Sequence, residues 1–117
     1  MRIEYMNSMS DCPTCFVLIF DLKEYIPENY FKEWVHEAEL NFYVDILKKH
    51  NLLEDKSSNI KDIIWSRHYE CCYNDIPFTM VFDKDWGDIS FAVENSKYRK
   101  EIAEYLCSVI EKEKIFK

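Results

Sequence analysis

The chain has 117 residues, of which 48% are hydrophobic and 16% aromatic, with one glycine and three prolines. It has enough apolar material to fold as a single globular domain over residues 1–117, which argues against a disordered or loop-rich chain. Its formal net charge of −7 argues against nucleic-acid binding, because that affinity comes mainly from Lys and Arg side chains that neutralise phosphates.

Residues 1–8 contain no apolar segment of the kind that a secretory signal peptide needs. The most apolar run, 15–20, is far too short to span a bilayer, so we expect no association with membranes. We therefore predict a cytoplasmic protein whose five cysteines are thiols, since their odd number does not suit a disulfide framework.

The first predicted elements are a short strand at 2–6 and a strand near 15–21. The second is a continuous apolar run with β-branched and aromatic residues, which indicates a strand covered on both faces. A helix follows over 27–50, with Pro27 in its first turn, where the missing N–H costs no hydrogen bond. One face of this helix carries an apolar stripe at helical spacing: Phe31, Trp34, Val35, Ala38, Phe42 and Ile46.

The second half of this helix has apolar residues on the opposite face as well. Leu40, Tyr43, Val44 and Leu47 recur at i, i+3, i+4 and i+7. A helix that is apolar on two sides either lies between other segments or presents one side to a partner. In a chain of this length we favour packing under another segment, and the alternative is an interface with a partner or a second copy of the chain.

The segment 60–73 fits two periodicities. Its β-branched and aromatic content favours a strand near 63–73. In that strand Arg67 is the exception on a face otherwise made of Ile63, Trp65, Tyr69, Cys71 and Tyr73. As a helix, the shared face would instead consist of Ile60, Ile63, Ile64 and Cys71.

Two strands near 77–83 and 88–94 form the most clearly predicted structure, a β-hairpin. Large apolar residues alternate with smaller ones along both strands, so the register is specified by the face that must be buried. That register pairs Phe82 with Ile89, Met80 with Phe91, and Phe78 with Val93. Gly87, the only glycine, lies in the connecting turn, where a left-handed residue is commonly needed.

A second helix is predicted over 96–114, with a capping signal at Asn95-Ser96 and one apolar stripe. The order of elements is strands, a long helix, strands and a helix. This order indicates an α+β domain with an antiparallel or mixed sheet.

The cysteines suggest one metal site. Cys12 and Cys15 have the spacing of a pair that can share a zinc ion, and His68 with Cys72, or Cys71, would have to complete the ligand set. Because the second half lacks a paired ligand spacing, we expect buried, unreactive cysteines instead. We therefore predict that the chain has no cofactor, with zinc as the alternative.

Trp86 lies at the tip of the predicted hairpin among Asp83, Asp85 and Asp88. Tryptophan is a frequent binding hot spot, and acidic neighbours would steer a basic partner toward it. The alternative is that the indole ring folds back over the hairpin or a neighbouring helix.

These observations favour a non-enzymatic, acidic protein-binding module over a zinc protein or an oligomeric structural domain. In general type, as a short, acidic, aromatic-rich chain, it resembles bacterial immunity or antitoxin proteins, although no family motif carries the resemblance. That resemblance implies a basic protein partner such as a toxin. The predicted partner-binding residues are Asp83, Asp85, Trp86 and Asp88.

Overall fold

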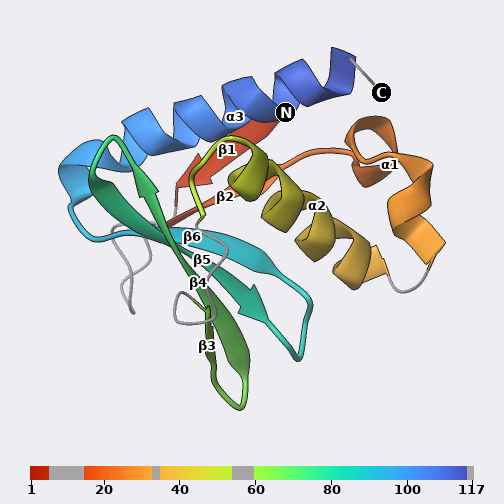
Figure 1. Ribbon diagram of the computed structural model, residues 1–117, viewed down its shortest axis with the longest axis horizontal. Helices are drawn as coiled ribbons and strands as arrows, with labels where there is room; N and C mark the ends of the chain where they lie inside the picture. Colours follow the sequence, from red (N-terminus) through yellow and green to blue (C-terminus); the bar gives the residue numbers. More distant parts are fainter. Residues whose placement is uncertain (6–14, 33–34, 54–59, 116–117) are drawn as a thin grey trace.

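The structure is a computed structural model that describes residues 1–5, 15–32, 35–53 and 60–115 (Figure 1). Its elements in chain order are β1 (Arg2–Tyr5), β2 (Cys15–Ile19), α1 (Leu22–Tyr25), the 3-10 helix η1 (Glu28–Lys32), α2 (Val35–Lys49), β3 (Ile60–Asp62), β4 (Ser66–Tyr73), β5 (Ile76–Asp83), β6 (Ile89–Val93), the 3-10 helix η3 (Ser96–Tyr98) and α3 (Arg99–Ile115).

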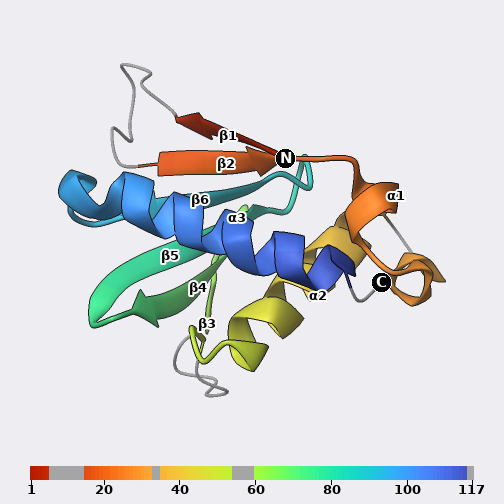
Figure 2. The same cartoon turned by 90° about the horizontal axis from the view of Figure 1, so that it is seen from above.

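The described strands form one six-stranded sheet in the order β1-β2-β6-β5-β4-β3. Every neighbouring pair is antiparallel. The predicted α+β class is therefore confirmed, and the sheet is antiparallel throughout. Figures 1 and 2 show α2 and α3 lying against this sheet, with β1 and β3 at its two edges.

The predicted hairpin and its register are confirmed in β5 and β6. Phe82 pairs with Ile89, Met80 with Phe91, and Phe78 with Val93. These six side chains lie on the face that packs against the helices, and Met80, Phe91 and Val93 are fully buried. Thr79, Val81, Ser90 and Ala92, which point to the other face, are only partly buried. The two-residue period thus decides which face of the sheet carries the core.

Aromatic rings link that sheet face to α2. Phe91 stacks on Phe16 of β2 with ring centroids 5.2 Å apart, and Tyr43 of α2 meets Phe91 edge-on at 5.5 Å. Phe42, on another side of α2, packs edge-on against Tyr30 of η1 at 5.9 Å. Helix α2 therefore lies between the sheet and the segment that contains η1.

This arrangement decides between the two interpretations of the second apolar face of α2. Leu40, Tyr43 and Leu47 are buried in the core cluster, and Val44 packs against it half-buried. The alternative interpretation of these four residues, an interface with a partner or a second copy, is therefore corrected. Three of them are buried within the chain's own core, where Tyr43 meets Phe91 of the sheet, so this face is not a free apolar surface.

The predicted strand near 63–73 is shorter than expected and is preceded by another strand. β3 ends at Asp62 and β4 begins at Ser66, and the backbone N–H of Ile63 donates to the carbonyl of Ser66 (2.8 Å) to close a turn between them. Tyr69 and Cys71 are buried on one face, as expected. Ile63 and Trp65, expected on that same face, lie in the exposed turn instead.

The predicted helices both begin with a separate 3-10 segment. The segment expected as one helix over 27–50 divides into η1 and α2, and that expected over 96–114 divides into η3 and α3. The capping role of Asn95 is confirmed, because its side-chain oxygen accepts a hydrogen bond from the N–H of Lys97 (3.0 Å). In the described part of the chain, no helix is long and apolar enough to cross a membrane.

One cysteine differs from the expectation of five thiols. Cys15, the first residue of β2, is disulfide-bonded. Cys71, Cys72 and Cys107 are free, and Cys12 lies outside the described residues. An odd number of cysteines argues against a framework of several disulfides, but it does not prevent a single pair of sulfurs from meeting in the fold.

Candidate functional site

The turn between β5 and β6 is held together by Asp83. One oxygen of its carboxylate accepts hydrogen bonds from the backbone N–H groups of Asp85 (2.9 Å) and Trp86 (3.1 Å). Its backbone carbonyl accepts a third bond, from the N–H of Gly87 (2.8 Å). Gly87 has a φ of 73°, which a residue with a Cβ adopts at a cost. Asp83 therefore shapes the turn with its carboxylate, as aspartates commonly do at the first position of a turn.

Trp86 extends away from the fold at this turn. Its side chain is 74% exposed, so the ring does not fold back over the hairpin. Asp85 and Asp88 are also exposed. The structure thus brings the four predicted partner-binding residues together, and it gives three of them a surface position and Asp83 a supporting one.

The turn between β3 and β4 carries exposed apolar residues that the sequence analysis assigned to a strand. Ile64 is 79% exposed and Trp65 66%, and the neighbouring Ile63 is about half exposed. None of these three residues is a usual turn former, so the apolar run carried no local signal of a turn. The feature that could have indicated it is the break in alternation at Ile63-Ile64-Trp65.

Lys84 connects these two turns. Its backbone N–H donates to the carbonyl of Trp65 (3.0 Å), and its ammonium group donates to the carbonyl of Ile63 (2.8 Å). The same ammonium group forms an ion pair with Asp62. The carboxylate of Asp62 also lies 3.6 Å from the guanidinium Nε of Arg67. Hydrogen bonding to Lys84, with a smaller contribution from Arg67, lowers the pKa of Asp62 and keeps it ionised. Figure 1 shows both turns at the same end of the sheet, away from α3.

The proposed zinc ligands that the structure describes do not come together, and Cys12 lies outside the described residues. Cys15 pairs with Ala92 of β6, Ala92 with Thr79 of β5, and Thr79 with Glu70 of β4. Three strand spacings separate Cys15 from Glu70, or about 14 Å, whereas sulfur and nitrogen ligands lie within about 2.3 Å of zinc. His68 and Cys72 flank Glu70 on β4, so they are too far from Cys15 to share an ion with it.

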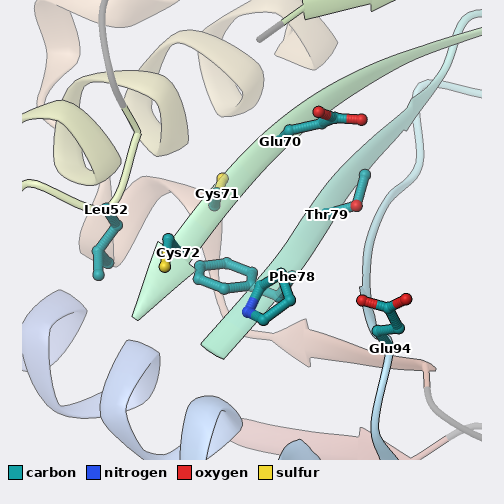
Figure 3. Close-up of a pocket in the computed structure, with 8 residues that line it drawn as sticks. Leu52, Glu70, Cys71, Cys72, Phe78, Thr79 and Glu94 are labelled. Atoms are coloured by element: carbon teal, nitrogen blue, oxygen red, sulfur yellow. The ribbon is translucent and has the colours of Figure 1, made fainter. Parts of the chain in front are cut away.

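The adjacent cysteines on β4 differ in environment. Cys71 is buried, and burial raises the pKa of its thiol to about 12, so it stays protonated. Cys72 is exposed and lines a hollow of about 450 Å³ with Glu70, Thr79 and Glu94 (Figure 3). Among the residues that the structure describes, no group of three His, Cys, Asp or Glu side chains is arranged so that it could hold a metal ion.

A second hollow, of about 500 Å³, lies where β2 and β6 separate. These strands pair only through Cys15 and Phe16, and beyond them the hollow is lined mainly by residues of β2 and the β5–β6 hairpin. Glu39 of α2 lines it together with Asp83 and Asp88. Burial, and secondarily the charge of Asp88, raises the pKa of Glu39 to about 7. This proximity could not be predicted from local patterns, because Glu39 and Asp88 lie on distant segments of the chain.

Comparison with known proteins does not identify a relative, since no family model, curated protein or solved structure matches the chain. The function must therefore be argued from the surface itself.

Proposed function

We propose that this chain is a binding module for a protein partner with a basic surface, and that the turn 83–88 contacts the partner. The observation that carries the proposal is the exposed indole of Trp86 between the exposed carboxylates of Asp85 and Asp88. An exposed tryptophan contributes nothing to the core, yet it supplies a large contact area at the centre of many interfaces.

Charge supports a basic partner. The whole chain carries a formal net charge of −7, and three aspartates lie within the turn 83–88. The basic side chain of this turn, Lys84, is engaged with Ile63 and Asp62. Such a surface attracts a basic protein over long range and repels phosphates and a second copy of itself. A toxin that acts on nucleic acid needs a basic cleft to bind its substrate, and an acidic surface such as this one would be complementary to that cleft. We therefore favour an immunity or antitoxin role.

The test is a selection from a random peptide library displayed on phage. Wild-type protein is the target, no counter-selection is applied, and the selected peptides are then tested for binding to the double variant Trp86→Ala/Asp85→Lys. We expect peptides that combine Lys or Arg with apolar residues. We also expect their affinity to fall at least tenfold in the double variant and to weaken as NaCl increases, because exposed charges are screened by salt.

Two matched variants control for charge and for exposed apolar area elsewhere. Glu101→Lys reverses one exposed acid on α3, and Ile19→Ser removes an exposed apolar side chain on β2. Both should bind the selected peptides within twofold of wild type. Selected peptides that are acidic, or that bind the double variant as well as wild type, would show that this turn is not the binding site.

A further inference from the structure

The exposed apolar side chains of this chain are concentrated at one place. Seven large apolar residues are exposed in the described part of the chain, and four of them lie in the two turns that Lys84 connects. These four, which we call the turn surface, are Ile63, Ile64, Trp65 and Trp86. They include the three most exposed of the seven. A concentration of this kind is typical of an interaction site, whereas single exposed apolar residues are ordinary.

Backbone and side-chain contacts of Lys84 hold the two turns next to each other. The bond from the N–H of Lys84 to the carbonyl of Trp65 continues the pairing of β4 and β5 by one step beyond Ser66 and Asp83. The ammonium group of Lys84 then reaches across to Ile63 and Asp62. A partner that contacts Trp86 therefore meets a second aromatic turn already held beside it, and less conformational entropy is lost on binding.

The charges around the turn surface specify what it can face. Asp85 and Asp88 are exposed beside it, whereas Asp62 is paired with Lys84 and Arg67. A second copy of the chain would bring equal acidic groups together, and an anionic membrane would be repelled. The chemistry that fits is an apolar protein site with basic residues at its rim.

We propose that the two turns form one docking surface, that a single basic protein partner contacts Trp65 and Trp86 together, and that Lys84 is the residue that positions the two turns. The inference rests on the proposed function. It adds a second contact, the β3–β4 turn with Trp65, to the contact that Trp86 makes. Lys84 acts through the turns and need not touch the partner.

The experiment uses the peptides selected on wild-type protein. It measures their affinity for Trp65→Ala, for Trp86→Ala and for the variant that carries both of these substitutions. We expect each single variant to lose at least tenfold in affinity. We also expect the losses to be non-additive in the double variant, because the two rings contact one ligand. Ile60→Ser, at an exposed position of β3 outside both turns, is the matched control and should stay within twofold of wild type.

The role of Lys84 is tested by Lys84→Met, which keeps the length of the side chain and removes its charge, and by Lys84→Arg, which restores the charge. We expect the non-additivity between Trp65→Ala and Trp86→Ala to disappear in the Lys84→Met background and to return in the Lys84→Arg background. A purely structural role would lower stability without changing that coupling. Thermal unfolding of each variant establishes that it is folded.

The outcomes separate the two proposals. If Trp86→Ala weakens binding and Trp65→Ala stays within twofold, the single docking surface is wrong and the proposed function stands. If neither variant affects the peptides, both proposals are wrong. If the coupling persists in Lys84→Met, the two turns act together and Lys84 is not what positions them.

Discussion

At the scale of single residues, Glu39 combines a largely buried position with an acidic neighbour. It lies between Ala38 and Leu40, which are both buried, and shares a hollow with Asp88 and Asp83. Glu39 also interacts electrostatically with Tyr43, one turn along α2. No basic side chain lines that hollow among the described residues, so the ionised form of Glu39 has no compensating charge there.

We predict that Glu39 makes the protein less stable as pH rises from about 4.5 to about 7. The pKa of Glu39 is raised to about 7 in the folded chain, so in this window the unfolded chain releases a proton that the folded chain still holds. Stability from this group is therefore highest below pH 4.5 and lowest above pH 7. Glu39→Gln should flatten this slope and raise the free energy of unfolding at pH 8 by about 1–2 kcal/mol, after allowance for solvent screening.

Urea unfolding of both proteins between pH 5 and pH 8 checks this, with Glu101→Gln on α3 as an exposed control. The control should keep the slope of wild type. A Glu39→Gln variant with the same slope as wild type would contradict the assignment, as would a Glu39 carboxyl that titrates near pH 4.5 in a ¹³C NMR experiment.

How far the sequence predicted the site depended on whether the signal was local. Trp86 was placed at a hairpin tip because Gly87 and the alternating strands lie within a few residues of it. The supporting role of Asp83 was missed, although aspartate at the start of a turn is a known signal. Glu39 could not be found, because its environment depends on Asp88 across the fold, and the exposure of Trp65 was missed although the alternation breaks at Ile63-Ile64-Trp65.

At the scale of elements, the two-residue period predicted the β5–β6 hairpin and its register, because a shift by one residue would expose Phe78, Met80 and Phe91. The same reasoning failed at 60–73. Ile63, Ile64 and Trp65 have the composition of a strand and lack any turn former, so composition outweighed the break in alternation, and the pairing of β3 with β4 shows the turn.

The turn between β4 and β5 contains two non-glycine residues with positive φ angles, which cost conformational energy. Tyr73 pairs with Ile76, and the two residues between them, Asn74 and Asp75, have φ values of 48° and 64°. Two positive φ angles define the turn type that matches the twist of the strands, and glycine suits its second position best. We predict that Asp75→Gly raises the free energy of unfolding by about 0.5–1 kcal/mol.

Chemical unfolding measured at one pH checks this prediction. Asp85→Gly is a matched control, because Asp85 is an exposed turn aspartate that does not have a positive φ. We expect no gain in that variant. A gain of equal size in both variants would mean that the loss of a negative charge, rather than the backbone conformation, is responsible.

At the scale of the whole molecule, the core and the proposed docking surface occupy different places. The buried residues of α2, α3 and one sheet face form a single cluster, whereas the turn surface lies beyond the end of the sheet (Figures 1 and 2). Substitution of Trp65 or Trp86 should therefore leave folding nearly unchanged, which is what makes the binding experiments interpretable.

Phe91 is the residue on which the single cluster can be tested. It is fully buried, stacks on Phe16 of β2, and meets Tyr43 of α2 edge-on, so it joins the sheet to the helix layer. We predict that Phe91→Ala lowers the free energy of unfolding by about 3–5 kcal/mol, through lost burial and a residual cavity. Phe91→Leu should lower the free energy of unfolding by a smaller amount. This variant can still be measured if the alanine variant does not fold.

Ser90→Ala, one residue away on the opposite face of β6, is the control and should change stability by no more than about 0.5 kcal/mol. Urea unfolding followed by circular dichroism and by tryptophan fluorescence supplies the measurement. The two transitions should coincide in wild type and in Phe91→Leu, because β4 and β5, the strands next to Trp65 and Trp86, share one core with the helices. Separate transitions, or a loss below about 1 kcal/mol in Phe91→Ala, would show that the sheet and the helices do not unfold as one cooperative unit.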